Sequence, residues 1–487
     1  MRPRAVARTM ASMLSMNAHD VPVLVVGAGP AGLAAALELA RHDIPSLLVE
    51  RRTMLSSHPR ATTLSLRSME LVRAWGLESE VGAHSVEVDW RMLESETLAD
   101  AAAGTTIAVG YPNPEQSSMV SPTAPACVAQ DDLEPLLLER LLAAPHARVA
   151  LGTELTGIFA GADGVRADLR DVRTGALRTV HARYVVAADG AHSALRRALS
   201  IPLIGPEVLM EGATTLFRAP LWDVVGEHRH VLYSVTHPST PAVFLPAGPP
   251  DRWLVGFEDS DVDTPNELRA ATLIRLAAGV PDLPVRVERS RSFSSTAQLA
   301  ERWRTGRVFL AGDAAHRVTP RGGTGLNLAL HDGYDLGWKL GWVLRGWAGP
   351  QLLDSYEAER RPVAEYTAAR SADPGGSRRA AEHEVRADLG GRIAHVWAGE
   401  RSTLDLLEPG LTLFATRDEP AWDSAAASLT AHVPIGVQFL DPIAARAVGA
   451  PGGSALLARS DGTPVGVLPA GADPLPSLRA AVAAVAA

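Results

Sequence analysis

A glycine-rich turn between a short apolar strand and an alanine-rich helix most constrains the fold of this chain. Residues 23–26 read Val-Leu-Val-Val, a β-branched run typical of a buried parallel strand. Gly-Ala-Gly-Pro-Ala-Gly follows directly, then a helix predicted over residues 33–41 and a strand predicted over residues 46–50, which ends in Glu50. Strand, Gly-X-Gly-X-X-Gly turn, helix and closing acid together form the dinucleotide-binding fingerprint. The sequence therefore predicts a Rossmann-like α/β domain.

Each glycine of this turn has its own role in the prediction. Gly27 permits the tight turn, Gly29 lets the backbone approach a pyrophosphate, and Gly32 lets the helix pack closely on the strand. Pro30 and Ala31 of the turn are also expected at the cofactor, and the free N–H groups at the helix N-terminus face the phosphate. The acid that closes the second strand can accept hydrogen bonds from ribose hydroxyls. The alternative is a glycine-rich turn in a Rossmann-like fold that has lost its ligand.

Two later strands also end in polar turns. Residues 184–193 read YVVAADGAHS and residues 307–316 read RVFLAGDAAH. Each alone is an ordinary junction of strand and turn. Together with the first turn, and in this order, they resemble the class A flavin-dependent monooxygenases, the p-hydroxybenzoate hydroxylase superfamily, and within it the phenol and aromatic-polyketide hydroxylase branch. The resemblance is strong over residues 20–370 and weak beyond them.

The resemblance implies FAD as the bound cofactor and NADPH, in preference to NADH, as a transient co-substrate. It also assigns residues to the cofactor through the family's motifs. These residues are Glu50 and Arg51 at the adenosine ribose, Arg60 and Gln130 beside the FAD, Asp189 in FAD and NAD(P)H handling, and Gly312 and Asp313 at the ribityl chain.

A second glycine-rich loop, residues 319–327, precedes a helix predicted over residues 326–344. A reduced flavin carries negative charge around N1 and the C2 oxygen, which backbone N–H groups at a helix N-terminus would oppose. The alternative is a loop that only caps the helix, with Asn327 holding the first turn. The loop residues expected at the flavin are Pro320, Gly325, Leu326 and Asn327.

Arg321 is the one catalytic candidate, and it departs from the family pattern. Family members often have Pro or Phe where this chain has Arg321, and Gln where it has Thr324. An arginine beside the flavin could steady an anionic substrate or the reduced cofactor, or it could be an ordinary surface charge. No general base can be named from the sequence.

Residues 201–289 predict a mixed or antiparallel sheet that roofs the flavin and, by the resemblance, lines the substrate pocket. Tyr233, Phe244 and Trp253 are candidates for stacking on a flat substrate, with core residues as the equal alternative. The strands are predicted over residues 214–217, 230–235, 242–245 and 253–257.

We expect the chain to form two large domains, a connector and a smaller C-terminal domain. The C-terminal domain resembles the thioredoxin-like domain of the hydroxylase branch, but it has no cysteine, which excludes thioredoxin chemistry. The roles left open for this domain are to pack against the rest of the chain, to form a dimer contact, or to form a wall of the pocket. The expected segments are a disordered tail over 1–19 with Met16 as a second candidate start, an FAD-binding domain over 20–200 and 290–370, a substrate-binding sheet domain over 201–289, a helical connector over 371–398, and a thioredoxin-like domain over 399–487.

Composition limits the partners. Lys and Arg number 46 against 55 Asp and Glu, a net charge of −9, which does not indicate nucleic-acid binding. Cys127 is the one cysteine, so a disulfide and a cysteine-based zinc site are ruled out. His228 and His230 alternate on a strand without further ligands, and we predict no metal site. We expect no membrane span, a cytoplasmic location, and leave a homodimer open.

The function implied by the resemblance is FAD-dependent monooxygenation. NAD(P)H reduces the flavin, O2 forms a C4a-hydroperoxide, and one oxygen atom enters a phenolic or polyketide-type aromatic substrate. The Ala- and Arg-rich composition favours natural-product tailoring. Baeyer–Villiger insertion, epoxidation, a flavin-dependent reductase or dehydrogenase that does not use O2, and a non-catalytic flavoprotein remain alternatives. The WxWxIP-type segment of flavin halogenases is absent from the sequence.

Overall fold

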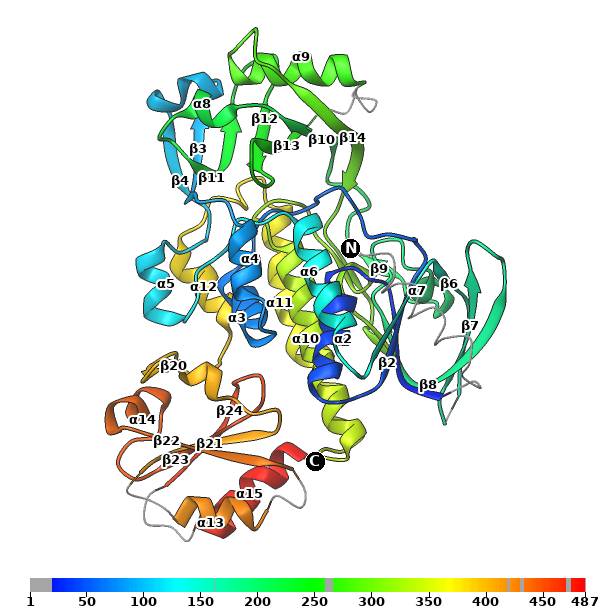
Figure 1. Ribbon diagram of the computed structural model, residues 1–487, viewed down its shortest axis with the longest axis vertical. Helices are drawn as coiled ribbons and strands as arrows, with labels where there is room; N and C mark the ends of the chain where they lie inside the picture. The colour runs from blue at the N-terminus through cyan, green and yellow to red at the C-terminus, as the bar shows by residue number, and fades with distance from the viewer. Residues whose placement is uncertain are drawn as a thin grey trace.

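The fold has three main sheets and two minor ones. In Figure 1 the eight-stranded sheet lies at the right, the seven-stranded sheet at the top and the four-stranded C-terminal sheet at the bottom. The computed structural model describes residues 20–161, 163–258, 266–417, 421–429, 433–469 and 474–486. The tail expected over residues 1–19, with the second candidate start at Met16, lies outside the described residues.

The dinucleotide fingerprint lies at the centre of an eight-stranded sheet. β1 (Asp20–Val26) pairs in parallel with β2 (Ser46–Glu50) on one side and with β8 (Leu177–Ala187) on the other. With partners on both edges, residues 23–26 are all buried, as their apolar run predicted. The other strands are β16 (Arg304–Thr305) and β17 (Val308–Leu310) beyond β8, β5 (Ala147–Leu151) beyond β2, and the antiparallel pair β6 (Thr153–Ala160) and β7 (Val165–Asp171), of which β7 joins β8.

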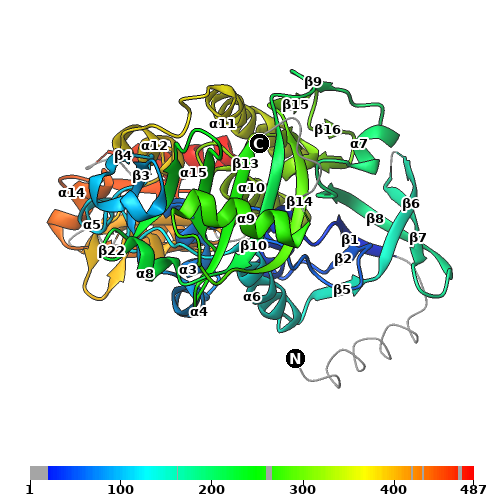
Figure 2. The same cartoon turned by 90° about the horizontal axis from the view of Figure 1, so that it is seen from above.

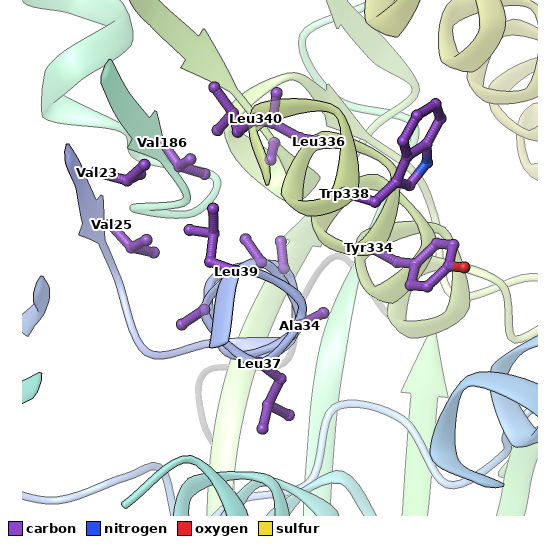
Figure 3. Close-up of a cluster of buried hydrophobic side chains, with 14 of the residues drawn as sticks. Val23, Val25, Ala34, Leu37, Leu39, Val186, Tyr334, Leu336, Trp338 and Leu340 are labelled. Carbon is purple, nitrogen blue, oxygen red and sulfur yellow. The ribbon is translucent and has the colours of Figure 1, made fainter. Parts of the chain in front are cut away.

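Helices α2 (Pro30–Arg41) and α10 (Gly325–Arg345) pack against each other beside this sheet. Figure 3 shows side chains of α2, β1, β8 and α10 meeting in one apolar cluster. The two helices approach so closely that a Cβ atom on Gly333 would lie 2.1 Å from the Ala31 carbonyl oxygen. The first turn of α2 is therefore fixed against α10, the helix that follows the second glycine-rich loop.

A seven-stranded sheet forms the upper body of Figure 1 and is wider than the sequence predicted. The predicted strands are present, but β3 (Asp89–Ser95) pairs in parallel with β11, and β4 (Thr105–Ala108) continues the edge. The sheet therefore draws on residues well before 201–289. Its remaining strands, in order from the other edge, are β14 (Arg286–Ser295), β10 (Met210–Arg218), β13 (Arg252–Glu258), β12 (Ala242–Pro246) and β11 (His230–Val235).

Short helices cover the outer face of this sheet. Figure 2 shows α9 (Glu267–Ala278) lying across the strands on the side away from the first sheet. Helix α8 (Leu221–Val225) and the 3-10 turn η1 (Leu98–Ala103) complete the cover. The outer face is thus a hydrophobic core, and the opposite face turns toward the FAD-binding part.

The C-terminal sheet has the strand order β22-β21-β23-β24. β21 (Leu411–Thr416) and β22 (Ile435–Leu440) are parallel, whereas β23 (Ala455–Ala458) and β24 (Pro464–Leu468) run antiparallel and form a hairpin. Helices α13 (Ala421–Ala427), α14 (Pro442–Val448) and α15 (Pro474–Ala486) follow β21, β22 and β24. A βαβ unit followed by a ββα unit is the predicted thioredoxin-like arrangement.

Buried charges join this small sheet to the helices of the FAD-binding part. Arg459, after β23, donates to Glu359 at 2.8 Å, and the fully buried Lys339 of α10 donates to Glu359 at 2.9 Å and to Asp335 at 2.8 Å. Within the described residues, Asp335, Glu359 and Asp461 are the one group of acids spaced to hold a cation. Lys339 and Arg459 between them pair with all three acids, so this cluster is a structural ion-pair network.

The remaining elements connect these three bodies. The segment expected as a helical connector is only partly helical, because α11 (Ser355–Ala372) ends at its start and α12 (Ala381–Leu389) occupies its middle. None of the helices described reaches the length and apolarity that crossing a bilayer demands. The other elements are α3 (Leu66–Ala74), α4 (Glu78–His84), α5 (Pro114–Val120), α6 (Gln130–Leu142), α7 (Ala194–Ala198), β9 (Leu203–Ile204), β15 (Gln298–Ala300), β18 (His316–Arg317), β19 (Trp397–Ala398), β20 (Arg401–Ser402), η2 (Gly312–Ala314), η3 (Pro350–Asp354) and η4 (Thr403–Leu406). The minor sheets are β18-β15-β9 and β19-β20.

Candidate flavin and substrate site

The three glycines of the first turn have the three environments that their roles require. Gly27 has a φ of 110°, and a Cβ atom there would lie 2.2 Å from the Ala188 carbonyl oxygen. A Cβ atom on Gly32 would lie 1.9 Å from the Gly27 carbonyl oxygen. Gly29, in contrast, has nothing within 4 Å of its Cβ position. Two glycines thus allow close backbone packing, and the middle one leaves room for a ligand to approach.

The N-terminus of α2 is free to bind an anion. Its N-cap residue Gly29 makes no side-chain cap, and Pro30 occupies the first turn without needing an acceptor. Glu50 steadies the turn, because its carboxylate accepts from the Ala28 amide at 3.0 Å and from the Arg52 amide at 2.9 Å. Arg51 is exposed beside it. The turn, the helix end and the acid fit the diphosphate and ribose of a dinucleotide.

Asp189 organises its own turn. Its carboxylate accepts from the Ser193 hydroxyl at 2.5 Å and from the Leu195 amide at 3.0 Å, at the start of α7. The buried Arg196 then donates to the Ala314 carbonyl at 3.0 Å, which ties this turn to the Gly-Asp turn after β17. The two turns predicted from the sequence therefore lie side by side.

The Gly312-Asp313 turn sits against the start of α2. Gly312 has a φ of 62°, and its Cβ position lies 3.0 Å from Ala31 Cβ. The half-buried Asp313 carboxylate has no hydrogen-bond partner among the described residues, which suits an acceptor for ligand hydroxyls. Behind the turn, the fully buried Asp332 of α10 accepts from the Gly312 amide at 3.1 Å. Sequence reasoning missed Asp332, although an acid within the apolar run of α10 was a usable signal.

The N-terminus of α10 is built as predicted for flavin contact. The N-cap Thr324 makes no side-chain cap, so the first-turn N–H groups of Gly325, Leu326 and Asn327 are left to other acceptors. The Asn327 side chain does not cap its own helix. It accepts from the Ser65 amide at 2.8 Å and donates to backbone oxygens of the facing segment and of the loop. This amide thus fixes the helix start.

The two other loop residues named from the sequence lie nearer the solvent. Pro320 is exposed, and Arg321 is half-buried with its amide donating to the Thr319 hydroxyl at 3.4 Å. The position of Arg321 in this loop keeps it a candidate for contact with substrate or flavin.

Gln130 forms a buried amide–carboxyl pair at the start of α6. Its side-chain amide donates to Glu134 Oε1 at 2.6 Å, and both residues are buried. Burial raises the pKa of Glu134 to about 7, against the opposing hydrogen bond from Gln130 and the charge of Arg60. Arg60 itself is exposed. Gln130 and Arg60 therefore both act on Glu134, and their contact with the cofactor stays a prediction.

We expect Glu134→Gln to stabilise the apoprotein at about pH 8. A carboxyl with a raised pKa holds its proton more tightly in the folded state, so its stabilising contribution is lost as pH rises through about 7. The neutral amide avoids this loss, by up to about 3 kcal/mol, and the gain shrinks toward about pH 5. Thermal unfolding across this pH range measures it. Glu139→Gln, an exposed position of the same helix, should change stability by less than about 0.5 kcal/mol at either pH.

The aromatic residues proposed for substrate stacking lie in the core instead. Tyr233, Phe244 and Trp253 have no exposed surface and share the outer face of the upper sheet, packed under α8 and α9. Tyr233 also donates its hydroxyl to the His228 carbonyl at 2.8 Å. The face turned to the FAD-binding part carries the alternate positions, such as Leu216. The structure therefore favours the alternative that the three aromatic residues belong to the core. His230, on the same strand as Tyr233, is also buried.

A cavity that sequence reasoning missed borders the second glycine-rich loop and the start of α10. It is lined by Tyr111, Gly322, Thr324, Arg370 and Glu384, which come from four separate parts of the chain. The buried Arg370 donates to Glu384 through Nη1, while Nε and Nη2 have no hydrogen-bond partner among the described residues. A Cβ atom on Gly322 would lie 2.8 Å from Nη2, so this guanidinium faces the loop.

Comparison with known proteins identifies the class that this fold and site define. The family described as "FAD binding domain" matches residues 20–371. Tetracenomycin A2 monooxygenase-dioxygenase of Streptomyces glaucescens is 34% identical over 483 residues, covering 84% of this chain and 85% of that protein. Aklavinone 12-hydroxylase DnrF of Streptomyces peucetius is 39% identical over 366 residues, covering 72% of this chain and 73% of that protein. The chain belongs to this family, the class A flavin monooxygenases.

Solved structures agree over nearly the whole chain. Aklavinone-11 hydroxylase, in a ternary complex with FAD and aklavinone, matches with a TM-score of 0.85 at 30% identity, covering 97% of this chain and 100% of that one. The flavin-dependent monooxygenase PieE, with FAD and substrate, matches with a TM-score of 0.86 at 27% identity, covering 96% and 100%. The predicted fold class, the monooxygenase assignment and FAD as the cofactor are confirmed.

Proposed function

We propose that the chain uses NADPH and O2 to insert one oxygen atom into a flat aromatic substrate of the polyketide type. The observation that carries this proposal is a cavity that adjoins the N-terminus of α10. Thr324 and Asn327, at the start of that helix, line the cavity together with the buried Arg370. A flavin ring held at the helix N-terminus would therefore border a place for a second molecule. Relatives named as polyketide hydroxylases support the substrate class.

The chain's own residues account for binding and orientation of the cofactor. The amide groups after Gly29 would take the diphosphate, Glu50 and Arg51 the adenosine ribose, and Asp313 the ribityl hydroxyls. The N–H groups at the start of α10 would oppose negative charge on the reduced ring, worth about 0.3–1 kcal/mol when exposed and up to about 2 when partly buried. When bound, FAD supplies the electron transfer and the activation of O2.

Arg370 would orient the substrate. Two of its guanidinium nitrogens are buried without a partner, and an unpaired buried donor costs free energy until it finds an acceptor. Phenol or quinone oxygens offer such acceptors. Arg321, in the same loop, is a second guanidinium for the same purpose or for the reduced cofactor.

The test is a coupled measurement on the holoenzyme. NADPH oxidation and O2 uptake are followed together, with and without a panel of phenols and polycyclic quinones, while H2O2 is trapped. We expect a substrate to stimulate NADPH oxidation with little free peroxide and to gain the mass of one oxygen atom. NADPH oxidation without O2 uptake would contradict the proposal and indicate a reductase. A product with an expanded ring or an epoxide would replace hydroxylation with one of the other oxygen insertions.

A further inference from the structure

Three arginines gather around one buried histidine at the junction between the upper sheet and the FAD-binding part. His58 is buried, and its Nε2 lies 3.3 Å from the Thr214 hydroxyl of β10. Burial, and then the charges of Arg291, Arg289 and Arg60, lower the pKa of His58 to about 4. The histidine is therefore neutral at physiological pH, and the positive charge of this junction comes from the arginines.

The register of β14 sets the direction of two of these arginines. Arg291 pairs with Thr214 and Arg289 pairs with Leu216, so the two arginines lie on one face, two residues apart. Thr214 contacts His58, which belongs to the segment after β2, so this face is the one turned toward the FAD-binding part. Arg289 also lines a cavity there, together with Ser57.

The acids of this cavity already have partners. Asp131 accepts from Arg252 at 2.5 Å, and Glu288 accepts from Arg218 at 2.7 Å. Asp132 lies 3.7 Å from the same Arg252.

Arg60, Arg289 and Arg291 are different, because none of their guanidinium groups makes a hydrogen bond or an ion pair with any residue in the described ranges. Together they leave uncompensated positive charge in a chain whose net charge is −9. Such a cluster favours a ligand that carries several negative charges.

We propose that Arg289 and Arg291 bind the phosphate groups of the reduced nicotinamide coenzyme. The inference rests on the proposed function, which requires NADPH to reach the flavin. The chain has one dinucleotide turn, which FAD would take, so the coenzyme needs a second place for its phosphates. The arginine cluster, which includes Arg60, lies near the start of α6, at the edge of the proposed cofactor site. NADPH bound there would have its phosphates anchored while its nicotinamide remains free to reach the flavin.

The test is anaerobic rapid mixing of the holoenzyme with NADPH or NADH. The double variant Arg289→Gln and Arg291→Gln is expected to raise the apparent Kd for NADPH at least about tenfold, because charge-assisted hydrogen bonds are lost. The rate of flavin reduction at saturation, the FAD content and reduction by dithionite should not change. The matched control is Arg166→Gln with Arg170→Gln, two exposed arginines of β7 in the far hairpin, which should leave the Kd unchanged.

Comparing NADPH with NADH shows which phosphate groups the arginines bind. An equal loss for NADPH and NADH assigns the arginines to the shared pyrophosphate, and a loss for NADPH alone assigns them to the 2′-phosphate. Both results support the inference. An unchanged Kd for both coenzymes in an enzyme that they reduce normally overturns it, as does a loss of FAD affinity in the variant. A wild-type flavin that neither coenzyme reduces contradicts the proposed function itself.

Discussion

Replacing Gly32 by alanine is expected to give a protein that no longer retains FAD. The new Cβ atom would lie 1.9 Å from the Gly27 carbonyl oxygen and 3.4 Å from Ala188 Cβ. The first obstacle is backbone, which cannot rotate away as a side chain can. Relief requires α2 to move from β1, which displaces the helix N-terminus and the open Gly29 position together. We expect overpacking to cost at least about 1–3 kcal/mol and the FAD affinity to fall far more than stability does.

The measurement is the ratio of flavin to protein after purification, followed by titration of the apoprotein with FAD. Gly29→Ala separates binding from folding, because nothing lies within 4 Å of its Cβ position and its φ of −82° suits alanine. This variant should keep the melting temperature of the apoprotein and still bind FAD more weakly. Gly82→Ala, in α4 and equally free of neighbours, should leave the Kd for FAD unchanged and should not lower the melting temperature, because alanine favours a helix over glycine by about 1 kcal/mol. A Gly32→Ala protein with the wild-type Kd for FAD would refute the argument.

The features that the sequence predicted well depend on neighbours along the chain. The strand over residues 46–50 has the predicted bounds, and α10 exceeds its prediction by one residue at each end. Apolar runs, glycines and caps are local signals, and they specify where such elements begin and end. Helix α2 begins at Pro30, three residues before its predicted start, because proline is well suited to the first turn of a helix.

The errors concern contacts between distant segments. β3 joins β11 across more than 130 residues of sequence, and no pattern in either strand indicates the other. The prediction that Tyr233, Phe244 and Trp253 face a substrate was wrong for a related reason. A period of two divides a strand into two faces, but here both faces are covered, one by helices and the other by the FAD-binding part. The alternation alone could not say which face meets the substrate.

The cavity at Arg370 could not be predicted from the sequence for the same reason. Tyr111, Gly322, Arg370 and Glu384 meet only after α11 and α12 fold back over the flavin loop. Arg370 gave no signal, because it resembles any arginine near the end of an amphipathic helix. Once its burial and its unpaired nitrogens are known, it becomes a better candidate than the aromatic residues that were chosen by type.

Replacing Asp332 by asparagine is expected to loosen FAD as well as destabilise the fold. This carboxylate has no exposed surface, and besides the Gly312 amide it accepts from His316 at 2.5 Å and from Arg360 at 2.9 Å. An amide has one acceptor oxygen and would leave the half-buried Arg360 without its counter-charge. Breaking a buried pair in this way costs about 3–5 kcal/mol. The Gly312 turn, and with it Asp313, would lose the contact that holds it against α2.

Two comparisons show whether Asp332 positions the Gly312 turn or only stabilises the fold. They are the pH dependence of stability and the same substitution at the neighbouring Asp335. Burial opposes ionisation of Asp332, but His316 and Arg360 hold its pKa below the usual value. Its stabilising contribution is therefore present above about pH 4 and is lost as pH falls, so the gap between wild type and Asp332→Asn should narrow in acid. Asp335→Asn, one turn along α10 and paired with the buried Lys339, should also lower the melting temperature. Because Asp335 does not touch the cofactor turn, its variant should keep the wild-type Kd for FAD. Equal losses of FAD affinity in both variants would show that Asp332 acts through stability alone.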